Sequence, residues 1–364
     1  MDTTTGVPEL SVIAWEVTRR CIMDCRHCRA GEKPATSEGE LSTRECMHLI
    51  DDMASFCSPV VMITGGEPML RDDLPEIIHH MTGKGIGTTL SPCGPLVEEN
   101  NLSLLKDAGL GYISFSIDAI DAAAHDDFRG YPGAFASVLK GIEAVKKAGM
   151  DFAVLTTVTR HNYRDLPRIL QLASDLGSVF FIPFFLVPTG KGKNLRHRQL
   201  SPAEYEDCLN WLYDVSVGGK MPPVRRDVVI RPGCAPHFYR IIHQREGTYR
   251  LSFFGTPITE GCLAGISYLF ISYSGIVQPC GYLDLECGDV RTESLQTIWE
   301  TSPLFQNIRT PRAYGGKCAV CEFLSVCRGC RARAYAETGN YMREDPYCSH
   351  VPGTQPCPVK CHAG

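Results

Sequence analysis

Six apolar, β-branched runs alternate with helical patterns over residues 1–190, and this alternation restricts the fold more than any other feature of the chain. Because alternating strands and helices form a parallel sheet with right-handed crossovers, we predict an α/β fold. Six units are fewer than the eight of a closed barrel, so the prediction is a partial (β/α)6 barrel. The strands are expected at Leu10–Val17, Val60–Thr64, Gly85–Leu90, Tyr112–Ile117, Phe152–Thr159 and Val179–Val187. The helices are expected at Thr43–Phe56, Asp73–Lys84, Glu98–Ala108, Ala134–Ala148 and Arg164–Leu176.

The pattern changes after Pro188. Thr189–Leu200 is basic, has no acidic residue and is expected to be a loop. Ser201–Tyr213 is a predicted helix with Ser201 as N-cap and a capping-box glutamate. From Leu251 onwards the expected strands are short and the turns frequent. The predicted organisation is a barrel over 1–190, a bridging region with a helix over 191–250, a small Cys-rich auxiliary domain over 251–350 and a tail over 351–364.

Composition excludes several classes of protein. Lys+Arg 36 against Asp+Glu 41 gives a net charge of −5, so the chain as a whole is no general nucleic-acid binder. No apolar run approaches the roughly 18 residues of a membrane span, and the polar segment 1–8 has no signal core, so we expect a cytoplasmic protein without a membrane partner. In that compartment the 18 cysteines favour metal ligation over disulfides.

Three cysteines follow the first predicted strand as C-x3-C-x2-C, at Cys21, Cys25 and Cys28. Three thiolates on one short loop can bind three irons of a [4Fe–4S] cluster and leave the fourth iron open to a chelating ligand. The alternative is a zinc loop, which would need four ligands in a closed tetrahedron, and no fourth ligand is obvious nearby.

Polar residues follow other predicted strands at the same edge, which is the ligand-binding rim of a β/α barrel. Gly65 and Gly66 permit close approach of a ligand to the backbone, and Glu67 suits an amine, although a Gly-Gly after a strand is often only a turn. Ser116-Ile117-Asp118 and Thr156–Arg160 end two further strands and could hold a ribose and a carboxylate.

The remaining cysteines crowd into the C-terminal third. Cys262-x12-Gly275-x4-Cys280 precedes Cys318-x2-Cys321-x5-Cys327-x2-Cys330 and Cys348, and such thiolates suit zinc or iron–sulfur. Cys46, Cys57, Cys93 and Cys208 occupy helical or core-like contexts and are expected to be packing residues. Cys357 and Cys361 receive no role.

Together, the cysteine loop, the Gly-Gly-Glu-Pro turn, the Ser-Ile-Asp segment and the six-unit alternation resemble the radical S-adenosylmethionine (SAM) superfamily. The resemblance implies that Cys21, Cys25 and Cys28 hold a reducing [4Fe–4S] cluster, and that SAM, bound to the open iron, is cleaved to a 5′-deoxyadenosyl radical. It also implies SAM contacts, with the amine at Gly65, Gly66 and Glu67, the ribose at Ser116 and Asp118, the carboxylate at Arg129 and Arg160, and the cluster or adenine near His27. The alternatives are local caps for the two arginines and a surface position for the histidine.

The C-terminal cysteines resemble the SPASM extension, which implies one or two auxiliary [4Fe–4S] clusters. One would use Cys318, Cys321, Cys327 and Cys348, and the other Cys262, Cys280 and Cys330, with Cys234 or Cys287 as a further ligand. The sequence departs from the usual extension in one spacing, because two residues rather than three separate Cys327 from Cys330.

Further segments resemble the haem-pathway branch of SPASM proteins, the Fe-coproporphyrin III decarboxylases that make haem b. They include Ala14–Arg19, Cys234–His237, Val277–Tyr282, Cys327–Ala336 and Glu344–Cys348; Tyr268–Phe270 departs by lacking an expected cysteine. The resemblance implies oxidative decarboxylation of two propionates of an iron tetrapyrrole, with ferredoxin or flavodoxin as electron donor. Arginines should bind the carboxylates. The candidates are Arg225, Arg226, Arg231, Arg240, Arg331, Arg333 and the basic segment 191–198.

Three alternatives remain open at this stage. The first is removal of acetate side chains from didecarboxysirohaem, or the related haem d1 step. The second is maturation of a peptide or a sulfatase, against which stands the short segment before the first strand. The third is a zinc-binding structural protein.

Overall fold

The computed structural model describes residues 7–217, 228–246, 251–253, 256–258 and 261–353. Within them ten strands form one sheet in the order β12-β11-β10-β1-β2-β3-β4-β5-β6-β7, and β8 pairs with β9 in a separate ribbon. The strands are β1 (Val12–Thr18), β2 (Val60–Gly65), β3 (Gly87–Leu90), β4 (Tyr112–Ser116), β5 (Phe152–Val158), β6 (Phe180–Phe185), β7 (Val229–Ile230), β8 (Leu251–Phe253), β9 (Thr256–Ile258), β10 (Tyr268–Ile271), β11 (Ile276–Gln278) and β12 (Gly288–Asp289).

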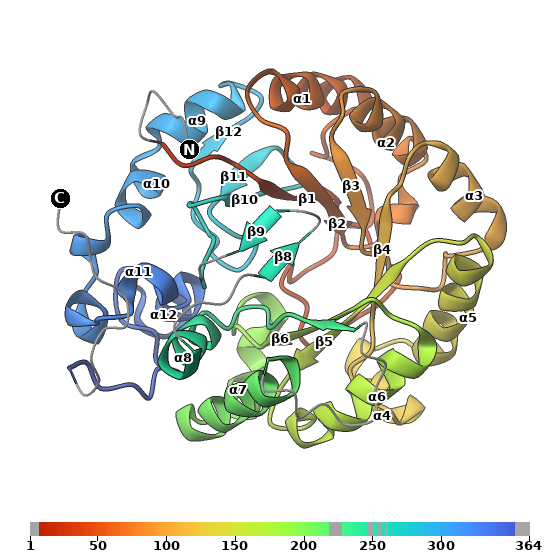
Figure 1. Cartoon of the computed structure of the whole chain (residues 1–364). Coiled ribbons are helices and arrows are strands. Elements are labelled where there is room, and N and C mark those ends of the chain that lie inside the picture. Colours follow the sequence, from red (N-terminus) through yellow and green to blue (C-terminus); the bar gives the residue numbers. More distant parts are fainter. Residues whose placement is uncertain (1–6, 218–227, 247–250, 254–255, 259–260, 354–364) are drawn as a thin grey trace.

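Helices line the outside of this curved sheet (Figure 1). They are α1 (Thr43–Phe56), α2 (Leu74–Gly83), α3 (Glu99–Asp107), α4 (Ala122–Arg129), α5 (Ala134–Lys147), α6 (Leu166–Leu176), α7 (Pro202–Ser216), α8 (His237–Glu246), α9 (Leu295–Thr301), α10 (Pro303–Ile308), α11 (Leu324–Cys327) and α12 (Arg331–Thr338). Short 3-10 helices are η1 (Pro68–Leu70), η2 (Tyr163–Asp165), η3 (Gly190–Arg198), η4 (Pro311–Ala313) and η5 (Gly316–Val320).

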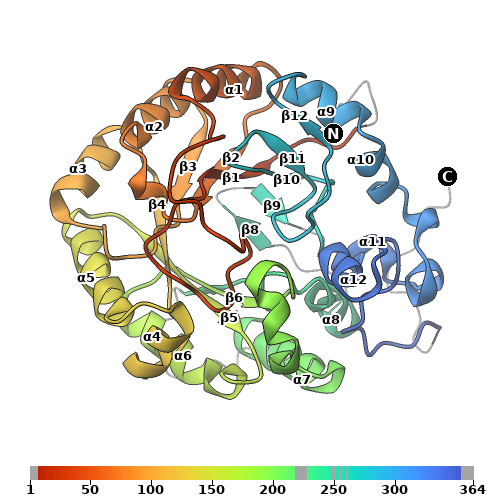
Figure 2. The same cartoon turned by 180° about the vertical axis from the view of Figure 1, so that it is seen from behind.

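The predicted α/β fold is confirmed. Strands β1 to β6 pair in sequential order and in parallel, as six strand–helix units require. The ring seen from behind in Figure 2 is continued by α7 to α12, and α9 returns to pack against α1. The predicted helix after residue 200 is also confirmed, because Ser201 and Glu204 form a complete capping box at the start of α7.

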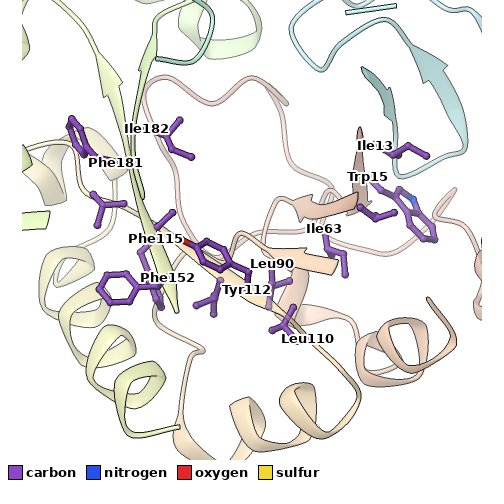
Figure 3. Packing of buried hydrophobic residues seen from close by; sticks show 14 of the residues in the cluster. Ile13, Trp15, Ile63, Leu90, Leu110, Tyr112, Phe115, Phe152, Phe181 and Ile182 are labelled. Atoms are coloured by element: carbon purple, nitrogen blue, oxygen red, sulfur yellow. The ribbon is translucent and has the colours of Figure 1, made fainter. Parts of the chain in front are cut away.

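Burial of large apolar side chains between the sheet and the helices holds the barrel together (Figure 3). Trp15, Phe115 and Phe181 are fully buried, and Phe152 is nearly so. Phe115 and Phe152 meet edge to face with ring centroids 6.3 Å apart. Each such side chain stabilises the fold by roughly 1.5–3 kcal/mol relative to an exposed one.

The structure differs from the expected local elements in two places. Helix α4 was not expected, because the only buried side chains of its eight residues are His125 and Phe128, too few for a clear periodic pattern. The basic segment expected as a loop is instead the 3-10 helix η3, held by backbone hydrogen bonds such as Gln199 N–H to Arg196 O at 3.2 Å.

The Cys-rich C-terminal part joins the barrel sheet directly. Strand β10 pairs in parallel with β1, with Val12 opposite Tyr268 and Trp15 opposite Ile271. Strands β11 and β12 then extend the sheet in antiparallel pairing. Because β1 leads into the loop of Cys21, this pairing places the C-terminal part beside the first cysteine motif.

Candidate functional site

Three cysteine thiols converge on a cavity of about 260 Å³ that opens where the parallel barrel strands end. Cys21, Cys25 and Cys28 all line it, from the loop that follows β1. Cys25 is buried and the other two are half-buried. A cubane held by three thiolates with one open iron fits this donor set, because the three side chains leave room beside them in the cavity.

A close backbone approach positions this loop against the Gly-Gly-Glu-Pro turn. The Gly66 N–H donates to Thr18 O at 2.8 Å and the Glu67 N–H to Arg20 O at 2.7 Å. A Cβ on Gly66 would lie 2.2 Å from Arg20 O, so a larger residue cannot occupy this position without moving the backbone. Gly66 therefore fixes the distance between the turn and the cysteine loop.

The main chain of the turn faces the cavity, whereas its acidic side chain points away. Gly65 and Gly66 line the cavity. The Glu67 carboxylate is fully buried and accepts hydrogen bonds from the Met69 N–H at 3.0 Å and the Cys93 N–H at 2.7 Å. Burial raises the pKa of Glu67 to about 7. This carboxylate thus links the turn to the loop that follows β3 by hydrogen bonds.

Ser116 and Arg129 line the cavity, and a buried carboxylate fixes the arginine. Asp118 accepts from Arg129 Nη2 at 2.6 Å and from the Thr157 N–H at 2.6 Å. Burial alone would raise the pKa of Asp118, but the Arg129 guanidinium and the other groups around the carboxylate, among them the Thr157 N–H, together hold the pKa below its usual value. Asp118 therefore acts on the cavity through Arg129, which comes from the unexpected helix α4.

His27 and Arg160 lie in different surroundings. His27 lines the cavity and stacks on Phe128 with ring centroids 4.4 Å apart. Burial lowers the pKa of His27 to about 3, so the ring is neutral, and its Nδ1 has no hydrogen-bond partner among the described residues. Arg160 does not line the cavity; its half-exposed side chain pairs with Glu204 at 2.9 Å.

Several cavity residues were missed by sequence reasoning. Cys93, expected to be a packing residue, also lines the cavity, with its Sγ 3.7 Å from the Sγ of Cys21. This hydrogen bond lowers the pKa of the Cys21 thiol to about 6. The sequence signal for this position was that Ser91-Pro92-Cys93 directly follows the third strand, at the rim where ligands bind. Other lining residues come from the C-terminal part, at Tyr268, Phe270 and Tyr282.

Four C-terminal cysteines surround a second, small cavity of about 20 Å³. They are Cys318, Cys321, Cys327 and Cys348, the set that the sequence predicts for one auxiliary cluster. A closed set of four thiols fits a fully ligated metal centre. His350 lies beside it, with its Nε2 3.1 Å from Glu322 Oε1, and Cys321, Glu322 and His350 also converge closely enough to share an ion.

A further group of thiols comprises Cys262, Cys280, Cys330 and Cys234. Cys234 and Cys280 pack with the buried Cys330 in one apolar cluster, and the Cys262 N–H donates to Cys327 O at 3.3 Å. Cys234 also has φ +53°, a left-handed conformation that is uncommon for non-glycine residues and that clusters at functional sites. Cys287 lies apart, packed against the main core and hydrogen-bonded to Ser302. Of Cys234 and Cys287, it is therefore Cys234 that lies with Cys280 and Cys330.

Most of the predicted carboxylate-binding arginines are already engaged. Arg333 pairs with the equally buried Asp345 at 2.9 Å and donates to Cys234 O. Arg331 donates to backbone carbonyls at 2.7 and 2.9 Å, and Arg240 pairs with Glu206 at 2.5 Å. Arg231 bonds Tyr239. None of these four side chains lines the cavity of the N-terminal cysteines, while Arg225, Arg226, Cys357 and Cys361 lie outside the described residues.

In the described part of the chain, every helix is too short or too polar to cross a bilayer. Comparison with protein families matches residues 15–173 to the radical SAM superfamily and residues 262–331 to the SPASM family, an iron-sulfur cluster-binding domain. The structure of SuiB from Streptococcus suis bound to S-adenosylmethionine shares the fold, with a TM-score of 0.74 at 16% identity over 95% of this chain and 79% of that one.

Two curated relatives resemble the chain over nearly its whole length. An AdoMet-dependent heme synthase of Oleidesulfovibrio alaskensis is 43% identical over 96% of this chain and 90% of its own. An Fe-coproporphyrin III synthase of Methanosarcina barkeri is 31% identical over 93% of this chain and 87% of its own.

Proposed function

Since the chain belongs to the family of radical SAM enzymes with a SPASM domain that includes the AdoMet-dependent heme synthases, we propose that it converts Fe-coproporphyrin III to haem b. The 43% identity to a heme synthase over almost the full length carries this proposal. Removal of acetate side chains from didecarboxysirohaem, the sister reaction, is less well supported, because the Fe-coproporphyrin III synthase is only 31% identical. Because the chain belongs to this enzyme family, we no longer interpret it as a zinc-binding structural protein.

The residues of the cavity have distinct tasks in this reaction. Cys21, Cys25 and Cys28 would hold the [4Fe–4S] cluster, which supplies the electron that cleaves SAM to the radical that abstracts a substrate hydrogen. Gly65 and Gly66 present main-chain groups to the SAM amine. Arg129, fixed by Asp118, offers its guanidinium to a carboxylate. Glu67 fixes the loop of Cys93 and Asp118 fixes Arg129, so both carboxylates act through their neighbours. Arg160 lies outside the cavity and is not assigned a SAM contact.

Two auxiliary clusters fit the C-terminal thiols. We assign one to Cys318, Cys321, Cys327 and Cys348, and the other to Cys262, Cys280, Cys330 and Cys234. Each decarboxylation leaves one surplus electron, and clusters held by these thiols would supply redox centres able to accept it. The donor that reduces the first cluster would be a ferredoxin or flavodoxin, in the cytoplasm, where thiol ligands stay reduced.

Each of two propionates loses one hydrogen atom to the radical, one CO₂ and one electron, and becomes a vinyl group. Two SAM molecules are consumed per haem. The test is anaerobic incubation of the reconstituted enzyme with SAM, reductant and Fe-coproporphyrin III, analysed by mass spectrometry. We expect two successive losses of CO₂ plus two hydrogens, with a monovinyl intermediate. Loss of acetate groups from didecarboxysirohaem, with Fe-coproporphyrin III unchanged, would establish the sister reaction instead.

A further inference from the structure

A larger cavity of about 580 Å³ adjoins the one that contains the three N-terminal cysteines. The two share Arg29, Phe270, Gly281 and Tyr282, so these residues form the boundary between them. The volume lies in the range of small-molecule sites, roughly 300–1,000 Å³. Only these few residues therefore separate a molecule bound here from the cysteine cavity.

Positive charge dominates the lining of this larger cavity. Arg19, Arg29, Lys193 and Arg196 line it, against the single carboxylate of Asp284 among the described lining residues. Asp284 accepts from Gln278 Nε2 at 2.6 Å. The cavity is thus suited to an anion with more than one negative group.

Part of this positive charge is not neutralised by the protein. The buried Glu16 carboxylate pairs with both Arg19, at 3.6 Å, and Arg29, at 3.3 Å, so one negative charge faces two guanidinium groups. The Nε of Arg19 is buried without a hydrogen-bond partner in the described part of the chain. Lys193 is exposed and forms no ion pair with another described residue. Lys193 and the guanidinium charge that Glu16 leaves unbalanced are therefore available to a ligand, whereas the buried Arg19 Nε is not.

The basic segment η3 is fixed beside the cysteine loop. The Lys191 N–H donates to Cys28 O at 2.9 Å. Gly190 has φ +53°, and a Cβ there would lie 2.3 Å from Arg29 O, so only glycine allows this contact. At its other end Arg196 donates to Ala336 O at 2.5 Å and pairs with Glu337 at 3.4 Å. The segment therefore spans from the cysteine loop to α12 and keeps Lys193 at the cavity.

Aromatic rings supply the apolar part of the lining. Phe270 lies under the Arg29 guanidinium, 4.4 Å from ring centroid to Cζ, and Tyr282 and Tyr335 line the same cavity. Flat rings beside fixed cations match a planar apolar molecule that carries carboxylates at its edge.

We propose that this cavity binds the tetrapyrrole, with Lys193, Arg196 and Arg19 on the two propionates that do not react, and with a reacting propionate directed past Arg29 and Phe270 into the cysteine cavity. The assignment rests on the proposed function for the identity of the ligand. It replaces Arg331 and Arg333 as carboxylate anchors, because those side chains are fully buried and line neither of the two cavities.

The test is anaerobic titration of Fe-coproporphyrin III into the reconstituted enzyme without reductant, followed by porphyrin absorbance. Lys193→Gln should weaken binding about fivefold, and Lys193→Gln with Arg196→Gln about twentyfold. Lys193→Arg should restore binding. Lys140→Gln, which removes an exposed cation from α5, is the matched control and should bind as the wild type does. Added salt should weaken binding by the wild type more than by the double variant.

A second probe, Fe-mesoporphyrin, carries only the two propionates that correspond to the unreacted ones. Its binding should show the same sensitivity to Lys193→Gln, and insensitivity would overturn the assignment of these cations to the unreacted propionates. A wild type that converts Fe-coproporphyrin III while the double variant binds it equally well would overturn the site and leave the function standing. A wild type that neither binds nor converts it would overturn both.

Discussion

The Sγ of Cys93 lies 3.7 Å from the Sγ of Cys21, although 72 residues separate them in the chain. Cys93 follows β3 and Cys21 follows β1, and both belong to the cavity because the intervening strand β2 brings the two strand ends together. A fourth thiol thus stands next to a three-thiol motif. The motif needs an open iron for SAM, so the two cysteines should differ in effect.

We expect Cys21→Ala to abolish 5′-deoxyadenosine formation, because the cluster loses one of its three thiolates. Cys93→Ala should retain it, since the three thiolates of the loop remain. Measurement of 5′-deoxyadenosine and iron in both variants distinguishes the roles. Equal iron loss in the two variants would identify Cys93 as a cluster ligand.

Gly66→Ala should destabilise the protein by about 2 kcal/mol or more, because the new Cβ meets Arg20 O at 2.2 Å and backbone must move. The control is Gly83→Ala at the end of α2, where a Cβ meets nothing within 4 Å; it should be neutral or stabilise by up to about 1 kcal/mol. Anaerobic thermal unfolding compares the two. Identical Tm values would show that the turn can relax around the added methyl group.

Asp345→Asn should cost about 3–5 kcal/mol, because it leaves the Arg333 guanidinium buried without its counter-charge. Burial would raise the pKa of Asp345, but Arg333, His237 and the backbone N–H groups that donate to the carboxylate together depress the pKa. The pair therefore contributes fully above the unfolded pKa of about 3.9, and its contribution is lost as pH falls through the lower folded value. Denaturant unfolding at several pH values should show a smaller acid-dependent loss in the variant. Asp107→Asn, at an exposed site on α3, should leave the wild-type profile unchanged.

Cys234→Ala should lower the iron content by up to one cluster relative to Cys287→Ala, because the structure groups Cys234 with three other thiols and leaves Cys287 against the core. Iron and sulfide analysis with Mössbauer spectroscopy measures this without reliance on turnover. Equal iron in the two variants would contradict the assignment of Cys234 as fourth ligand.

Local sequence patterns were sufficient to predict most strands and helices of the barrel. The bounds expected for Thr43–Phe56 agree with α1, and the six expected strands differ from β1 to β6 by at most two residues at each end. These elements depend on apolar periodicity and on caps such as Ser42 before α1, which are properties of neighbouring residues. Helix α4 escaped because its contacts are mostly polar, such as the His125 Nδ1 bond to the Asp118 N–H at 3.1 Å.

The sequence by itself determined the strand–helix alternation and the three-thiol loop after β1, because periodicity and close spacing are properties of neighbouring residues, whereas the set of Cys318, Cys321, Cys327 and Cys348 came from the resemblance to the SPASM extension. Only the tertiary structure decided that Cys234 joins Cys262, Cys280 and Cys330, that Arg333 serves Asp345, and that Arg19 and Lys193 line one cavity. The physical reason is that burial and charge pairing depend on contacts between distant segments. The parallel pairing of β1 with β10 creates several of these contacts, and no local pattern encodes it.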